Sequence, residues 1–249
     1  MRFEGIVIEN QSAHSTFCKG QQYCNRLVWN EHSYREISGA RVVSLDKTDE
    51  VSIHCCTFTC KMMAISHVWS HGQGGKHETM TNPKINPDAG GFNQCLHARY
   101  KLIAESYGCN SYWMDTPCIP EDHKLRHAAT SNINRVFTES KLTLICGKNI
   151  KQIDAGDLSL EIQESILSKL LVCDWNIRAW TYLEYMRGRQ NIHLLCKNEV
   201  VVCLKDILGF VSAYGSIAIA NLFLSAQHLL PHLKRPDKAL GKSGSTGEA

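Results

Sequence analysis

The sequence lacks a strong excess of charge of either sign. It has 27 Lys and Arg against 24 Asp and Glu, a net charge of +3 with neutral histidines. That excess is too small to indicate binding to nucleic acid or to a membrane surface. The chain also has no Lys/Arg run interleaved with aromatic residues, the pattern typical of a nucleic-acid groove. We therefore expect neither nucleic acid nor a membrane as a partner.

Long apolar runs are also scarce. The first residues, "MRFEGIVIENQ", contain no apolar stretch of signal-peptide length, so we expect the chain to start in the cytosol and to be cytoplasmic. Residues 207–224 carry no charge, but this stretch is at the lower limit for a membrane span and contains two glycines, two serines and an asparagine. We predict a packed C-terminal helix there.

Cysteine is abundant, with twelve residues, but no Cys-x-x-Cys pair occurs. In a reducing compartment such cysteines are most often small buried hydrophobic residues. The densest group is "HCCTFTC" at residues 54–60, with Cys18 and Cys24 upstream. Only Cys56 and Cys60 approach the spacing of two to four residues that zinc knuckles use. We therefore expect no bound metal.

From Arg41 onward, short apolar segments alternate with amphipathic ones. Strand–helix alternation of this kind predicts a doubly wound α/β sheet that is mostly parallel and flavodoxin-like, with helices on both faces and an N-terminal β extension. Wholly apolar runs such as "KMMAIS" are typical of strands buried on both faces. The predicted strands are residues 40–45, 51–58, 61–66, 111–115, 141–146, 191–198 and 199–204. The predicted helices are residues 96–107, 121–140, 158–172 and 174–188.

This pattern divides the chain into four parts. Residues 1–40 form an N-terminal extension and residues 41–206 the α/β domain. Residues 207–234 form a C-terminal helix, and residues 235–249 a tail that is disordered by composition.

Ligands of doubly wound sheets bind outside the carboxyl ends of the strands. Two of the predicted central strands end in polar side chains, followed by a glycine-rich loop that could close over them. The residues concerned are Ser66, His67, Trp69, Gly72, Gly74 and Asp115. Other roles stay open: Asp115 could cap its own turn, or bind zinc with His71 and His77, and Cys118 is a nucleophile candidate with no assigned base.

The stretch "RAWTYLEYM", residues 178–186, places Glu184 among aromatic residues. On a helical wheel, Trp175 and Met186 lie on the apolar stripe, and Glu184 lies opposite, one turn after Trp180. A glutamate beside an exposed tryptophan indicates a binding site. A pair with Arg187 would instead give Glu184 a structural role.

Three segments together resemble one family. "AISHVWS" (residues 64–70), "YWMDTPCIPED" (112–122) and "WNIRAWTYLE" (175–184) are similar, in this order, to motifs of the fungal heterokaryon-incompatibility (HET) domain. The resemblance covers roughly residues 41–197. HET domains trigger programmed cell death when incompatible fungi fuse, and their fold is similar to that of Toll/interleukin-receptor (TIR) domains.

The resemblance implies a function. Some TIR domains cleave NAD with a glutamate in a W-x-x-x-E motif, and Trp180 and Glu184 have that spacing. It implies catalysis by Glu184 and Asp115 in a homo-oligomer, with NAD as the substrate and no metal. The residues expected to bind NAD are Ser66, His67, Trp69, Gly72, Gly74, Arg178 and Trp180. The alternatives are a non-catalytic, self-associating signalling adaptor and, less favoured, a metal-dependent hydrolase.

Overall fold

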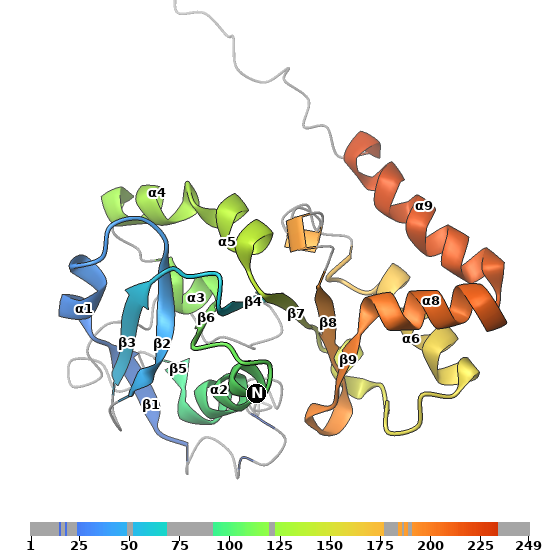
Figure 1. Ribbon diagram of the computed structural model, residues 1–249, viewed down its shortest axis with the longest axis horizontal. Coiled ribbons are helices and arrows are strands. Elements are labelled where there is room, and N and C mark those ends of the chain that lie inside the picture. Colours follow the sequence, from blue (N-terminus) through green and yellow to red (C-terminus); the bar gives the residue numbers. More distant parts are fainter. Residues whose placement is uncertain are drawn as a thin grey trace, which may run out of the picture.

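In the computed structural model, the strands form a nine-stranded sheet in the order β5-β1-β3-β2-β6-β4-β7-β8-β9 (Figure 1). The structure describes residues 15, 18, 24–48, 52–68, 92–119, 123–176, 184–185, 187–188 and 191–233. The strands are β1 (Arg26–Trp29), β2 (Arg41–Thr48), β3 (Ser52–Thr57), β4 (Met62–His67), β5 (Phe92–Asn93), β6 (Ser111–Trp113), β7 (Leu142–Cys146), β8 (Ile192–Leu195) and β9 (Val201–Cys203).

The centre of the sheet is parallel. Strands β6, β4, β7 and β8 pair in parallel in that order, while β9 pairs antiparallel with β8. Every residue of β4 is buried, as the apolar run "KMMAIS" predicts for a strand covered on both faces. The prediction of a doubly wound α/β fold is confirmed.

Helices lie on both faces of the sheet. They are α1 (Glu31–Arg35), α2 (Gln94–Ser106), α3 (Asp115–Cys118), α4 (His123–Thr130), α5 (Ile133–Glu139), α6 (Leu160–Val172), α8 (Leu204–Tyr214) and α9 (Ile217–Leu233). Tyr100 of α2 packs on Tyr112 of β6, with ring centroids 5.9 Å apart, and Phe137 of α5 packs on the next residue, Trp113, at 5.3 Å. Successive strand side chains point to opposite faces, so α2 and α5 cover opposite faces.

The register extends these two faces to β4. Ala64 pairs with Trp113 and Ser66 with Ile145, whereas Met63 pairs with Tyr112 and His67 with Cys146. We call the first side the Ser66 face; its members are Ala64, Ser66, Trp113, Thr143 and Ile145. The other side, the His67 face, contains Met63, His67, Tyr112, Leu144 and Cys146.

The N-terminal part of the chain also contributes to this sheet. Strand β1 pairs in parallel with β3 and antiparallel with β5, which immediately precedes α2. Residues 26–29, from the segment predicted as an extension, are therefore part of the main sheet.

The segment predicted as one helix at 121–140 forms two, α4 and α5, with a break at Ser131 and Asn132. Ser131 Oγ donates to the carbonyl of His127 at 2.7 Å, and Asn132 Nδ2 donates to that of Ala128 at 2.8 Å. Serine and asparagine side chains compete for backbone groups in this way, which explains why the helix stops there.

The predicted C-terminal helix is likewise two helices, α8 and α9, separated at Gly215. A Cβ atom on Gly215 would lie 2.7 Å from both Glu164 Oε1 and Leu160 Cδ1 of α6, so a larger residue here would have to displace these two side chains. The amide of Ser216 then donates to Glu164 Oε1 at 2.6 Å and caps the start of α9. Among the described residues, no helix combines the length and the apolar character that a membrane crossing requires.

Candidate functional site

Three polar side chains join at the carboxyl end of β4 on the Ser66 face. Trp175 Nε1 donates to Ser66 Oγ at 2.6 Å, and Ser66 Oγ donates to Glu184 Oε2. Ser66 and Trp175 are both buried, and Glu184 is half-buried. The hydroxyl of Ser66 therefore fixes the carboxylate of Glu184 relative to the sheet, and Trp175 fixes the hydroxyl.

The turn that follows α6 positions Trp175. The amide of Asn176 donates to the carbonyl of Cys173 at 3.0 Å, and Asn176 Nδ2 donates to the carbonyl of Leu171 at 3.0 Å. The indole packs edge-on against Tyr185, which in turn packs against Phe223 of α9. Because each of these groups is buried, the indole N–H is held in one orientation.

The backbone near Glu184 approaches the sheet closely. Gly188 lies so near β7 that a Cβ atom there would be 2.2 Å from Thr143 Oγ1. Glycine is therefore required for the helical residues around Glu184 and Tyr185 to pack on the Ser66 face.

These contacts correct the helical-wheel interpretation. Trp175 is buried as predicted, but it lies in a turn rather than in the helix that contains Glu184. The wheel therefore does not relate the two residues, and Glu184, expected on the opposite side, binds the same hydroxyl as Trp175. Among the described residues no ion pair joins Glu184 to Arg187, whose side chain is exposed.

A second pair occupies the same end of β4 on the His67 face. His67 Nε2 lies 2.5 Å from Asp115 Oδ1, which also accepts the amide N–H of Thr116 at 2.7 Å. The side chains of His67 and Asp115 are only 2% and 16% exposed. Ser66 with Glu184 and His67 with Asp115 thus form two pairs at the same end of β4, on opposite faces of the sheet.

The remaining predicted site residues lie outside the described residues. They are Trp69, Gly72, Gly74, Arg178 and Trp180, together with the zinc-ligand candidates His71 and His77. Cys118 is described and fully buried, and this burial raises the pKa of its thiol well above the ordinary value. Such a thiol is a poor nucleophile.

Trp175 is a site residue that its sequence pattern does not predict. It opens the third HET-like segment, "WNIRAWTYLE", which was the signal available for it. Helical periodicity assigns it only to the core, because no local pattern shows that its N–H reaches Ser66.

A pocket of about 610 Å³ lies between α2 and β9, on the His67 face. It is lined by Ser15, Cys18, Cys95, Ala98, Arg99, Leu102, Ile103, Ser106, Tyr107, Glu199 and Val201. Arg99 is buried, and its Nε lies 3.6 Å from Glu199 Oε2. Glu199 has a φ of 63°, a left-handed conformation that a glutamate seldom adopts. Of the predicted site residues that the structure describes, none lines this pocket.

The structure also gathers cysteines that the sequence spacing did not pair. The sulfur atoms of Cys18, Cys24 and Cys95 all lie within 4.8 Å of one another. Six other cysteines, at positions 55, 109, 118, 146, 173 and 196, are buried, as predicted for small core residues.

The part of the chain that contains β4 is similar to one known protein family. No curated protein and no solved structure shows significant similarity to the chain. Residues 62–162 match the family model "Heterokaryon incompatibility protein (HET)". This segment contains β4 with Ser66 and His67, and Asp115 at the end of β6. Residues 62–162 are therefore similar to the HET family. Two of the three HET-like segments lie within this match, and the third, residues 175–184, lies outside it.

Proposed function

We propose that this HET-domain protein cleaves NAD at the bond between nicotinamide and ribose, with Glu184 as the catalytic carboxylate. The observation that carries the proposal is the Trp175–Ser66–Glu184 chain of hydrogen bonds at the carboxyl end of β4. Ligands of doubly wound sheets bind at this end. The incompatibility response of the family is the setting in which such an activity would act.

The proposed chemistry needs one well-placed negative charge. Cleaving the nicotinamide–ribose bond passes through an oxocarbenium-like state, as in glycoside cleavage. Nicotinamide leaves from a cationic ring as a neutral molecule, so no strong general acid is required. A carboxylate near the ribose would stabilise the developing positive charge most effectively if its position is fixed before the reaction.

Ser66 and Trp175 are positioning residues in this scheme. Without the Ser66 hydroxyl, Glu184 Oε2 would lose the partner that ties it to β4. Without the Trp175 N–H, the hydroxyl would lose the donor that orients it. Trp69, Trp180, Arg178 and the glycines at 72 and 74 remain predictions for NAD binding.

Asp115 is the second catalytic candidate, and its contacts favour a structural role. Its Oδ1 already accepts the Thr116 amide and contacts His67 Nε2. It also lies with His67, on the face opposite the pair of Ser66 and Glu184. Glu184 is therefore the catalytic carboxylate of the proposed reaction, and Asp115 mainly stabilises the end of β4.

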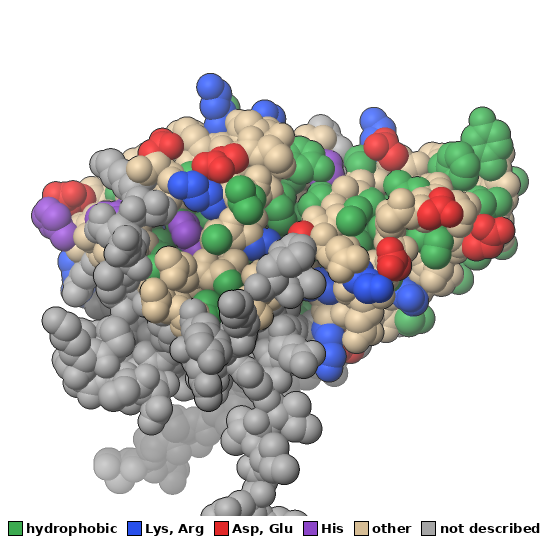
Figure 2. All heavy atoms as spheres, turned by 90° about the horizontal axis from the view of Figure 1, so that it is seen from below, with side chains coloured by type: hydrophobic (Ala, Val, Ile, Leu, Met, Phe, Trp, Pro, Cys, Tyr) green, Lys and Arg blue, Asp and Glu red, His purple; other side chains and the backbone are tan. Residues whose placement is uncertain are grey.

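A self-associating adaptor is the second candidate function. Large apolar side chains are exposed along α8 and α9, at the end of the molecule opposite β1; they are Phe210, Tyr214, Ile217, Leu222 and Leu224 (Figure 2). Exposed apolar surface of this kind favours association with another chain. It supports the prediction of a homo-oligomer, whether or not the protein is an enzyme.

The test is to incubate the purified chain with NAD and to measure nicotinamide release at low and high protein concentration. Glu184→Gln should lower the rate by on the order of a hundredfold. Glu161→Gln, which changes an exposed glutamate of α6 in the same way, should leave it unchanged. No release by the wild type at any concentration would favour the adaptor. Equal release by the wild type and Glu184→Gln would exclude Glu184 as the catalytic group.

A further inference from the structure

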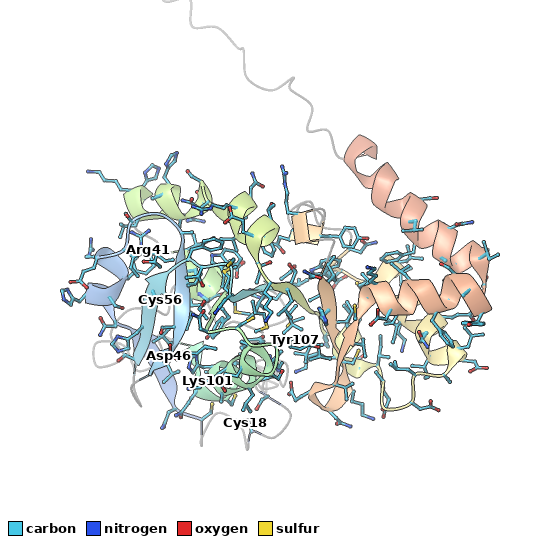
Figure 3. The ribbon with its side chains drawn as sticks, in the orientation of Figure 1. Cys18, Arg41, Asp46, Cys56, Lys101 and Tyr107 are labelled. Atoms are coloured by element: carbon cyan, nitrogen blue, oxygen red, sulfur yellow. The ribbon has the colours of Figure 1, made fainter. Side chains whose placement is uncertain are left out.

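Three thiols converge beside the first turn of α2. Cys18 and Cys24 precede β1, and Cys95 is the second residue of α2, yet their sulfur atoms lie within 4.8 Å of one another. Figure 3 shows Cys18 next to α2. All three side chains are half-buried, unlike the six cysteines that are buried in the core. The cluster is therefore accessible to an ion from solution.

The spacing of the sulfur atoms is close to that of a thiolate metal site. Zinc–sulfur bonds of 2.3 Å at a tetrahedral angle place two sulfur atoms about 3.8 Å apart. A small contraction of the cluster would reach this value. Three thiolates would fill three of the four tetrahedral positions and leave one for a further donor.

A backbone amide supports one of the sulfur atoms. The N–H of Ser15 donates to Cys95 Sγ at 3.3 Å. Hydrogen bonds from outer groups orient metal ligands and are a regular feature of metal sites. The guanidinium of Arg99, one turn further along α2, is buried and adds positive charge on the same side of the helix.

Thiolates are the donors that a thiophilic divalent cation prefers, and such a cation displaces the thiol protons when it binds. Three sulfur atoms within 4.8 Å of one another are therefore a donor set that one such ion can occupy.

We propose that Cys18, Cys24 and Cys95 bind one thiophilic divalent metal ion of the zinc class. Ser15, Cys18 and Cys95 also line the pocket of about 610 Å³. The ion fastens the segment that contains Cys18 and Cys24 to α2 and so fixes one wall of this pocket. This role is structural and is independent of NAD cleavage at Glu184.

The test uses the full chain, fully reduced and stripped of metal by a chelator, titrated with Co²⁺ and then with Zn²⁺. We expect one equivalent of Co²⁺ to bind with the near-ultraviolet absorption of cobalt–thiolate bonds, and one equivalent of Zn²⁺ to displace it. Cys18→Ser, Cys24→Ser and Cys95→Ser should each lower the affinity at least about tenfold. Cys203→Ser, which changes a half-buried cysteine outside the cluster, should bind as the wild type does.

Zinc should also raise the midpoint of thermal unfolding of the wild type, and less so that of the three variants. If Cys95→Ser does not fold, the metal affinities of Cys18→Ser and Cys24→Ser test the proposal instead. Absence of stoichiometric Co²⁺ binding by the reduced wild type would overturn the proposal. Wild-type Co²⁺ affinity in every cluster variant that folds would overturn it as well. So would a disulfide between two of the three cysteines that remains after full reduction.

Discussion

At β4, polar side chains make different hydrogen bonds on the two faces of the sheet. On the Ser66 face, polar groups form a chain from the buried indole of Trp175 to the half-buried carboxylate of Glu184. On the His67 face they form buried pairs: His67 with Asp115, and His97 Nδ1 with the hydroxyl of Tyr112, 2.9 Å apart.

This difference assigns the proposed catalysis to the Ser66 face and a mainly stabilising role to the His67 face. A chain of hydrogen bonds that runs outward from the core can hold a reactive group in place for a ligand. Pairs enclosed by α2 and α3 link neighbouring elements and mainly stabilise the fold, although His67 Nδ1 and His97 Nε2 are buried without a hydrogen-bond partner among the described residues. Changes on the Ser66 face should therefore reduce NAD cleavage more than folding, and changes on the His67 face should do the reverse.

The largest effect is expected from Trp175, where the core and the proposed site meet. Trp175→Ala should lower the free energy of unfolding by about 3–5 kcal/mol, because it leaves a cavity in place of a buried indole. Trp175→Phe keeps most of the packing but removes the N–H that Ser66 accepts. It should cost much less stability and still lower nicotinamide release. Urea unfolding followed by circular dichroism measures the first quantity; full activity of Trp175→Phe would contradict the positioning role.

On the His67 face, His97 should make stability depend on pH. Burial, together with the charge of Lys101, lowers its pKa from 6.5 to about 4. The unfolded chain therefore binds a proton at this site at higher pH than the folded chain, so stability is full above about pH 6.5 and is lost as the pH falls toward 4. The loss should be at most about 3 kcal/mol.

His97→Gln removes this titration and keeps a hydrogen-bonding side chain beside Tyr112. Urea unfolding at pH 7 and pH 4.5 should show a smaller pH-dependent loss in His97→Gln than in the wild type. His127→Gln, an exposed change on α4, is the matched control and should behave as the wild type. An unchanged pH dependence in His97→Gln would refute the assignment to His97.

On the Ser66 face, Gly188→Ala should push the backbone near Glu184 away from β7. The added Cβ would lie 2.2 Å from Thr143 Oγ1. Overpacking of this kind should cost about 1–3 kcal/mol of stability and should lower nicotinamide release through displacement of Glu184. The double variant with Thr143→Ala should recover part of both losses. Additive losses in the double variant would show that the two residues do not clash.

The smallest effects are expected from Ser66→Ala and Asp115→Asn, one variant on each face of the sheet. Ser66→Ala should lower nicotinamide release about tenfold, the equivalent of one hydrogen bond to a charged group, with about 1 kcal/mol lost in stability. Asp115→Asn should lose a similar amount of stability and change the activity less than threefold. If Asp115→Asn instead lost as much activity as Glu184→Gln, Asp115 would have to be added to the catalytic groups.

Much of the fold follows from local pattern. The apolar runs of β4 and β7 and the amphipathic stripes of α2 and α6 predict the alternation of strands and helices, and β9 was predicted as the partner of β8. The helix breaks at Asn132 and Gly215 were missed. They depend on a competing side-chain hydrogen bond in one case and on the close approach of α6 in the other.

The sequence by itself determined that Ser66, His67 and Asp115 stand at the ends of central strands, because the periods of strands and helices are local properties of the chain. Only the tertiary structure decided that Ser66 joins Trp175 and Glu184, that His67 joins Asp115 on the other face, and that Cys18 and Cys24 reach Cys95. These contacts link residues far apart in the sequence. They depend on strand register and helix packing, which no local period encodes.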